Sequence, residues 1–320
     1  MIRIDHIVCP LDFSEVSEEA LRQATELARW YGATITALYV WPTIPMGAIA
    51  AHSPVPPTHL DEHSRRDLTR ELAGMVKRSG LAAAQVRALV VEGDPATEIL
   101  RLAADHGADL LVMGTRGRSG LKRWILGSVT ESVLRRAPCP VLTVTTRARA
   151  HVSPAQLRTI VCAVDFSEAS LRAVEYGFSL AQEKRARLVL LHVVTGLGNP
   201  ADEALFLSPD FATRVKEDAL ARLRSLVPER ADDWSIPEAR VGVGRADIEI
   251  LRLARERSAD LVVMGAQRRQ GFDGLFSAST IRTVASKADC PVLAVPAPGR
   301  LAMSRPLAEL HSRQEERSAV

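Results

Sequence analysis

The chain contains one domain-length pattern twice, and this duplication constrains the fold more than any other feature of the sequence. Three segments recur in the same order: HIVCPLDFS (6–14) as TIVCAVDFS (159–167), ADLLVMG (108–114) as ADLVVMG (259–265), and CPVLTV (139–144) as CPVLAV (290–295). The first pair is offset by 153 positions and the other two by 151. A period of this length indicates a duplicated domain and not a solenoid repeat.

The repeat sets the domain bounds that we expect within the 320 residues. We expect a first domain at 1–146, a linker at 146–156, a second domain at 157–296 and a flexible tail at 297–320. The tail is rich in Arg and Glu and has no apolar periodicity, so it is not expected to join a core.

Within each copy, short apolar runs alternate with helical patterns. The first copy is expected to contain strand 4–11, a helix from Ser14 to about Trp30, strand 33–40, helix 60–79, strand 84–91, a helix from Asp94 to near Gly107, strand 108–113, helix 127–136 and strand 140–145. Strands that alternate with helices predict a parallel sheet with helices on both faces.

Composition narrows the function classes. Lys and Arg total 41 and Asp and Glu total 38, a formal charge of +3 that does not favour a nucleic-acid or membrane partner. We find no apolar run that approaches the length of a membrane span and no signal peptide. The cysteines fall at two equivalent pairs of positions, Cys9 with Cys162 and Cys139 with Cys290. Their place in apolar strands predicts buried, reduced thiols and a cytoplasmic protein.

The segment after the expected fourth strand has features that bind anions. Gly114 and Gly117 stand at the carboxyl end of a parallel strand, where open α/β sheets bind ligands. Glycine permits close approach of the backbone to a ligand, and it also permits positive φ. Residues 127–130 then open a helix whose N–H groups and dipole attract negative charge, and Ser128 and Thr130 add hydroxyl donors.

Basic residues surround the same segment: Arg116, Arg118, Lys122 and Arg123. Together with the glycines they favour a triphosphate ligand, although the P-loop pattern GxxxxGK[ST] is absent. A solvated charged face is the alternative interpretation. His59 and His63 lie four apart on an expected helix, but solvent-facing histidines are favoured there and no metal site is expected. No side chain near the segment is an evident general base, so efficient hydrolysis is not expected.

The segment resembles the ATP-binding loop of universal stress proteins, which reads G-x2-G-x9-G-[ST] after the fourth strand. Gly114, Gly117, Gly127 and Ser128 match every fixed position. The resemblance covers nearly the whole chain in both copies, including the DFSE segment after the first strand and the CPVL strand. It implies two tandem flavodoxin-like or Rossmann-like α/β domains, each with a five-stranded parallel sheet.

The resemblance also implies how a nucleotide is held. Asp12 and the backbone of Val40 would frame adenine and ribose, although joining Ser14 in capping the next helix is the other role open to Asp12. The implied cofactor is ATP, with or without Mg²⁺. The candidate binding residues are Asp12, Val40, Gly114, Arg116, Gly117, Arg118, Gly127, Ser128, Val129 and Thr130.

The second copy departs from this pattern at three positions: Arg268 replaces Gly117, Ala278 replaces Gly127 and Ile281 replaces Thr130. A long Arg268 side chain would fill the space where backbone approaches phosphate, but its charge can also contact a phosphate. We therefore expect a weaker or empty second site, formed by Asp165, Val193, Gly265, Arg268 and Ser279.

The resemblance implies a regulatory protein of the stress response and not an enzyme. Nucleotide occupancy would bias a conformation or a surface for an unidentified protein partner. A slow ATPase or nucleotide-transforming enzyme is the alternative, although the SGGxDS loop of related pyrophosphatases is absent after the first strand. A protein that binds no nucleotide is a third possibility. The fifth strands of this family pair across a two-fold axis, so the resemblance implies that the apolar fifth strands of the two copies pair as an internal pseudo-dimer, since unpaired apolar edges rarely stay exposed. We also expect the whole chain to form a homo-oligomer, most simply a dimer.

Overall fold

The computed structural model describes residues 2–43, 60–80, 85–117, 126–145, 157–195, 209–227, 237–266 and 278–297. The first domain consists of β1 (His6–Pro10), α1 (Glu15–Tyr31), β2 (Thr34–Pro42), α2 (Glu62–Arg78), β3 (Val86–Gly93), α3 (Pro95–Asp105), β4 (Leu110–Gly114), α4 (Ser128–Arg136) and β5 (Val141–Val144). The second consists of β6 (Thr159–Val164), α5 (Glu168–Lys184), β7 (Arg187–Val194), α7 (Pro209–Arg224), β8 (Glu238–Val243), α8 (Ala246–Glu256), β9 (Leu261–Ala266), α9 (Ala278–Lys287) and β10 (Val292–Pro296). The predicted alternation of strands and helices is confirmed. The predicted linker lies outside the described residues, as does the predicted tail after residue 297.

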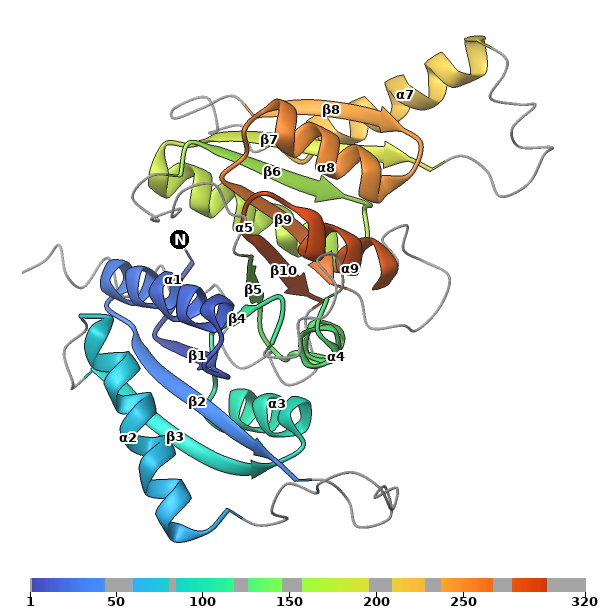
Figure 1. Ribbon diagram of the computed structural model, residues 1–320. Coiled ribbons are helices and arrows are strands. Elements are labelled where there is room, and N and C mark those ends of the chain that lie inside the picture. The colour runs from blue at the N-terminus through green and yellow to red at the C-terminus, as the bar shows by residue number, and fades with distance from the viewer. Residues whose placement is uncertain are drawn as a thin grey trace, which may run out of the picture.

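The described strands form one ten-stranded sheet in the order β3-β2-β1-β4-β5-β10-β9-β6-β7-β8 (Figure 1). Pairing is parallel within each domain. The domains join where β5 and β10 run antiparallel, with Thr143 opposite Val292, so the expected pairing of the fifth strands is confirmed. Each half has the strand order 3-2-1-4-5, which is the Rossmann-like arrangement among doubly wound α/β sheets.

Polar side chains directly before α1, α2, α3 and α5 fix where these helices begin. Ser14 caps α1 and Ser167 caps α5, and each hydroxyl oxygen accepts from the N–H three residues later. Asp61 and Asp94 cap α2 and α3 in the same way. Each cap satisfies an N–H group that has no partner within the helix, a contribution of about 1 kcal/mol. The helix starts predicted at Ser14 and Asp94 are confirmed.

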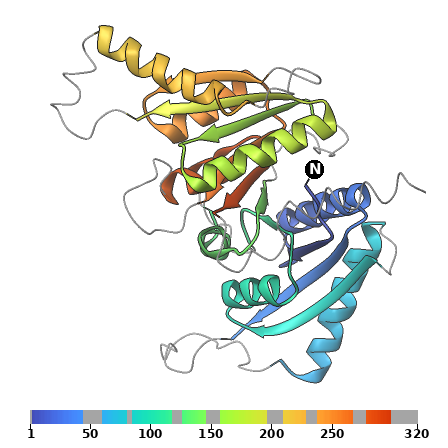
Figure 2. The same ribbon diagram turned by 180° about the vertical axis from the view of Figure 1, so that it is seen from behind.

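Two layers of helices bury the two faces of the sheet (Figures 1 and 2). Helices α1, α2, α5 and α7 cover one face, and α3, α4, α8 and α9 cover the other. Successive residues of β1 point to opposite layers, Cys9 into the first and Val8 into the second. Because both faces are covered, the central strands are continuous apolar runs. Burial raises the pKa of all four cysteine thiols, as expected for unreactive structural cysteines.

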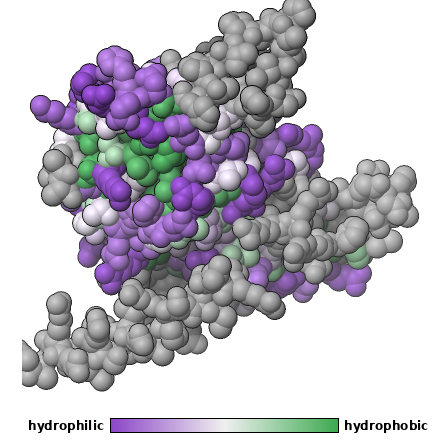
Figure 3. Space-filling view, turned by 90° about the horizontal axis from the view of Figure 1, so that it is seen from below, coloured by the Kyte–Doolittle hydropathy of each residue, from purple (hydrophilic) through white to green (hydrophobic). Residues whose placement is uncertain are grey.

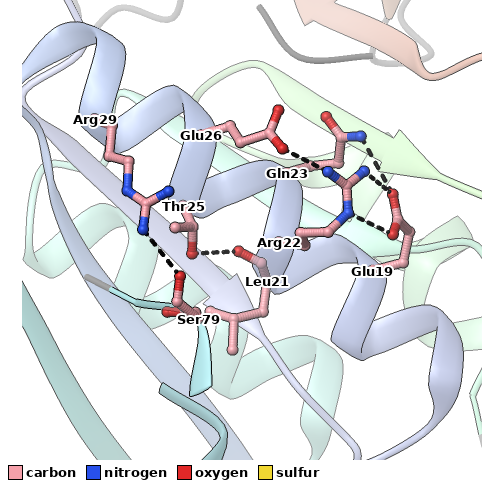
Figure 4. A network of polar contacts seen from close by, with 8 residues as sticks. All are labelled: Glu19, Leu21, Arg22, Gln23, Thr25, Glu26, Arg29 and Ser79. Atoms are coloured by element: carbon pink, nitrogen blue, oxygen red, sulfur yellow. Dashed lines mark hydrogen bonds and ion pairs between the residues drawn. The ribbon is translucent and has the colours of Figure 1, made fainter. Parts of the chain in front are cut away.

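Polar side chains of α1 contact one another and the end of α2 (Figure 4). Arg22 forms ion pairs with Glu19 and Glu26, one turn away on either side. Near the end of the helix, Arg29 donates to the carbonyl of Ser79 at 3.2 Å, which links α1 to the end of α2. The Arg29 contact therefore ties the end of α1 to the end of α2, whereas the ion pairs of Arg22 lie within α1.

The edges of the sheet are less covered than its centre. Strand β3 lies at one edge and is mostly half-buried, whereas every residue of β4 is buried. Figure 3, which views the molecule from below, shows apolar residues gathered in one area bordered by hydrophilic residues. Within the described part of the chain, no helix has the length and apolar character needed to cross a membrane.

Candidate functional site

A cavity of about 400 Å³ opens at the carboxyl ends of β1, β2 and β4. The sheet order reverses between β1 and β4, and doubly wound sheets bind ligands at this switch point. The volume lies within the range of small-molecule sites. The cavity is lined by Pro10, Leu11, Asp12, Ser17, Leu38, Tyr39, Val40, Pro42, Pro95, Ile99, Met113, Gly114, Arg116, Gly117, Gly127, Ser128, Val129 and Thr130.

The candidate residues from the sequence converge on this cavity. Every first-domain candidate except Arg118 lines it: Asp12, Val40, Gly114, Arg116, Gly117, Gly127, Ser128, Val129 and Thr130. Arg118 lies outside the described residues, as do Lys122 and Arg123. Candidate residues separated by up to 118 positions in the sequence therefore border one space.

Sequence reasoning missed the apolar wall of the cavity. This wall includes Leu38 from β2, Met113 from β4 and Ile99 from the first turns of α3. A signal for α3 was present, because Asp94 and Pro95 mark a helix start at the same sheet edge. Without strand order, however, nothing in the sequence says that α3 packs beside β2 and α4 at this cavity.

Asp12 follows β1 in a tight turn that is shared with the start of α1. Its Oδ1 accepts from the backbone N–H of Ser14 at 3.1 Å and from the Ser14 hydroxyl at 2.5 Å. Phe13, between them, has a φ of 61°, and its ring packs on Tyr39 with the centroids 4.8 Å apart. Non-glycine residues at positive φ are strained, and strain of this kind gathers at functional sites. Asp12 thus supports the cap residue of α1, and it also lines the cavity.

Glycine is needed at positions 114 and 117 because neighbouring atoms come too close for a Cβ. Neither residue has a positive φ, so backbone conformation is not the reason for glycine at these positions. A Cβ on Gly114 would lie 2.8 Å from Cγ1 of Val16 in α1, and a Cβ on Gly117 would lie 2.6 Å from Oδ2 of Asp12. Gly114 therefore allows β4 to pack against α1, whereas Gly117 allows the loop to pass the Asp12 carboxylate.

The first turn of α4 borders the cavity at Ser128, Val129 and Thr130. Its N-cap is Gly127, which makes no side-chain hydrogen bond to the turn, so the positive end of the helix faces the cavity without a competing cap. Thr130 differs from our expectation. Its buried hydroxyl donates to the carbonyl of Gly114 at 2.8 Å, so its proton ties α4 to β4 and is not directed at a ligand.

The cavity therefore has two kinds of wall. One is apolar, and the other combines the Asp12 carboxylate, the Arg116 side chain and the N-terminus of α4. A helix N-terminus and a guanidinium attract an anionic group, and an apolar wall accommodates a planar ring. The arrangement suits a ligand that carries both.

The second domain has the same turn after its first strand, but a different side chain packs against that turn. Oδ1 of Asp165 accepts from the Ser167 N–H at 3.0 Å, and Phe166 again has a φ of 61°. His192 stands where the first domain has Tyr39. Its ring lies 4.8 Å from Phe166, its Nδ1 contacts the Val164 carbonyl at 2.8 Å, and burial lowers its pKa.

The structure describes three further residues of the predicted second site. Val193 is buried at the end of β7, and Ser279 is exposed in the first turn of α9. A Cβ on Gly265 would lie 2.5 Å from the backbone nitrogen of Ser170. Arg268 lies outside the described residues.

Within the described ranges, no group of three His, Cys, Asp or Glu side chains is placed to hold a metal ion. Nε2 of His63 lies 3.3 Å from Oδ2 of Asp67, one turn further along α2. His59, the other histidine of the pair noted in the sequence, falls in a range that is not described.

Comparison with known proteins gives a family for both domains. The model of the universal stress protein family matches residues 3–145 and 156–296. A universal stress protein of Mycolicibacterium smegmatis is 28% identical over 304 residues, which cover 90% of this chain and 96% of that protein. One from Methanocaldococcus jannaschii is 37% identical over 139 residues, or 43% of this chain and 80% of that protein.

A solved structure shows the same fold. The crystal structure of a universal stress protein from Archaeoglobus fulgidus aligns with a TM-score of 0.63 at 21% identity, covering 93% of this chain and 100% of that one. Because the family pattern occurs twice and spans most of the sequence, the chain belongs to the universal stress protein family.

Proposed function

We propose that the first domain binds ATP in the cavity at the carboxyl ends of β1, β2 and β4, and that this binding is regulatory. One observation carries the proposal: a helix N-terminus with a glycine cap, Arg116 and Asp12 border the same apolar-walled cavity. Anions are favoured at such a helix start, and a purine fits an apolar wall.

Each group has a role that follows from its chemistry. The backbone N–H groups of Ser128 and Val129, with the Ser128 hydroxyl, donate to phosphate oxygens. Arg116 adds a charge-assisted donor. The Asp12 carboxylate can only accept when ionised, so it suits the ribose hydroxyls or the adenine amino group, with the Val40 backbone beside the ring. Bound ATP, with or without Mg²⁺, would bring the negative charge that this set of donors complements.

Binding without efficient turnover fits the lining residues. Among the described residues of the cavity, Asp12 is the one carboxylate and there is no histidine. The Asp12 carboxylate is already engaged with Ser14, and hydrolysis needs a base within reach of the attacking water. We therefore propose that occupancy biases a conformation or a protein contact in the stress response. Steady phosphate release by the purified protein would favour the slow-ATPase alternative.

We also infer a cytoplasmic location, because four reduced cysteines are buried in the core, and assembly of the chain into a homo-oligomer. Cell fractionation tests the first inference. Sedimentation of the purified chain tests the second, and a monomer at all concentrations would contradict it.

Calorimetric titration of the full chain with ATP tests the nucleotide site. In Gly117→Val the new side chain meets Asp12, and we expect at least tenfold weaker binding, about 1.4 kcal/mol. Gly74→Val in α2 is the matched control, because Gly74 does not line the cavity and a Cβ there would lie 3.5 Å from its nearest neighbour, the Arg78 guanidinium. We expect it to bind within about threefold of the wild type. Wild-type affinity in Gly117→Val, with an unchanged circular dichroism spectrum, would refute the site.

A further inference from the structure

The strands that join the two domains differ in one contact across the boundary, because the Thr143 hydroxyl donates to the Val292 carbonyl at 3.2 Å and β10 has Ala294 in the equivalent place. Two first domains could make the same bond, so it does not favour the mixed pair. Strand β5 reads VLTV and β10 reads VLAVP. Antiparallel pairing of such strands suits two first domains, two second domains or one of each. Any preference for the mixed pair must therefore come from residues that differ at equivalent positions across the same boundary.

Such residues lie at the ends of α1 and α5. Both helices have 17 residues, and α1 ends in Trp30 and Tyr31 where α5 ends in Glu183 and Lys184. The two carboxylate oxygens of Glu183 accept from the Trp30 indole N–H and from the Tyr31 hydroxyl, the latter at 3.1 Å. The Lys184 ammonium lies over the Trp30 ring and 3.6 Å from Glu183 Oε1. The four side chains form one cluster across the domain boundary.

Burial makes this cluster selective. The side chains of Glu183 and Lys184 are 13% and 3% exposed, and burial lowers the pKa of Lys184. Removing charged groups from water is costly unless they are paired. The indole face and the Glu183 carboxylate offset that cost for the ammonium. Trp30, which is 46% exposed, covers the lysine from the solvent side.

We propose that Trp30–Tyr31 on one helix and Glu183–Lys184 on the other form a recognition pair that makes each domain select the other copy as its partner. In a pair of first domains Trp30 would face Trp30, and an indole N–H can only donate. In a pair of second domains Glu183 would face Glu183, and Lys184 would have no indole to cover it. Only the mixed pair gives an acceptor to both the indole N–H and the Tyr31 hydroxyl and places an indole face over the ammonium.

The full chain allows the four combinations to be compared without separating the domains. Trp30→Glu with Tyr31→Lys places the acidic–basic pair on both helices, and Glu183→Trp with Lys184→Tyr places the aromatic pair on both. All four substitutions together exchange the pairs and restore a mixed contact. We expect each double variant to melt about 3 °C or more below the wild type, with faster proteolysis between the domains. The quadruple variant should return to within about 1 °C of the melting temperature of the wild type.

An exposed exchange on the same helices is the control. Glu18 and Leu171 occupy equivalent positions, with 58% of the Glu18 side chain and 37% of Leu171 exposed, and exchanging them should leave the melting temperature unchanged. If the quadruple variant loses as much stability as the two double variants added together, the proposal is wrong. If the double variants do not fold, a quadruple variant that folds with the wild-type melting midpoint still supports the proposal. A quadruple variant that does not fold overturns it.

Discussion

The two domains share one part of the site and differ in another. The shared part is the part in which packing contacts restrict the choice of residue. The turn after the first strand is the same in both, since Phe13 and Phe166 have a φ of 61°. The glycine that ends the fourth strand is also retained. A Cβ on Gly114 would strike the Val16 side chain, and a Cβ on Gly265 would strike the backbone at Ser170. Both retained features are thus explained by contacts within the fold.

The positions that differ have weaker constraints from the fold. Gly127 leaves room for a Cβ at ordinary contact distance, and the second domain has alanine there. Thr130 bonds to the Gly114 carbonyl, whereas the second domain buries Ile281 at that place. At these positions the copies therefore agree where the fold leaves no room for another side chain, and differ where the fold tolerates one. The following predictions test this division.

The largest effect is expected from the retained glycines. In Gly265→Ala the new methyl group would lie 2.5 Å from the Ser170 nitrogen and 2.7 Å from the Ala169 carbonyl carbon. Backbone cannot move aside as a side chain can, so we expect a loss of about 3 kcal/mol in the free energy of unfolding. Gly114→Ala should cost less, about 1–2 kcal/mol, because Val16 can change rotamer. Urea denaturation measures both, and equal stability of Gly265→Ala and wild type would break the comparison.

The next effect concerns nucleotide binding by the two domains. We expect calorimetry to give a stoichiometry near one ATP per chain, with the second site at least about tenfold weaker, or 1.4 kcal/mol. Ser128→Ala should weaken binding by about fivefold, the value of one hydrogen bond. Ser279→Ala, at the equivalent place in the second domain, should leave the titration unchanged. Two sites of equal affinity would show that Arg268 compensates for the missing glycine.

A smaller effect is expected when the first domain receives the residue of the second. Thr130→Ile removes the 2.8 Å bond to the Gly114 carbonyl and leaves that acceptor buried, which should cost about 1–2 kcal/mol of folding free energy. Thr130→Ser keeps the hydroxyl and should lose less. If denaturation midpoints put the isoleucine variant level with the serine variant, the bond contributes nothing and Thr130 is retained for another reason.

The smallest effect distinguishes His192 from its counterpart Tyr39. Burial lowers the pKa of His192 from its ordinary value of 6.5, so the unfolded chain binds the proton more readily than the folded one. Stability from this group is therefore complete above pH 6.5 and falls as the pH drops below it. In His192→Tyr the loss of stability between pH 7 and pH 5 should be smaller than in the wild type. Identical pH profiles of the melting temperature would exclude His192 as a source of pH dependence.

Much of the fold could be predicted from local signals in the sequence. Ser14 and Asp94 were predicted as helix starts because their side chains act on N–H groups three residues away. The candidate site could be predicted in outline, since glycines at a strand end and a helix start are also local features. The role of Thr130 could not, because its hydroxyl partner is a carbonyl 16 positions earlier in the chain. Nor could the pairing of Gly117 with Asp12, which lie on different strand ends.

The sequence by itself determined the duplication, the alternation of strands and helices, and the residue types that suit an anionic ligand. These depend on periodicity and on side-chain chemistry within a few residues. Only the tertiary structure decided that the Val16 side chain leaves no room for a Cβ at Gly114, that Thr130 bonds to β4, and that Trp30 contacts Glu183 across the domain boundary. Each of these depends on which strands become neighbours. That order is set by packing of the whole sheet and not by any one segment.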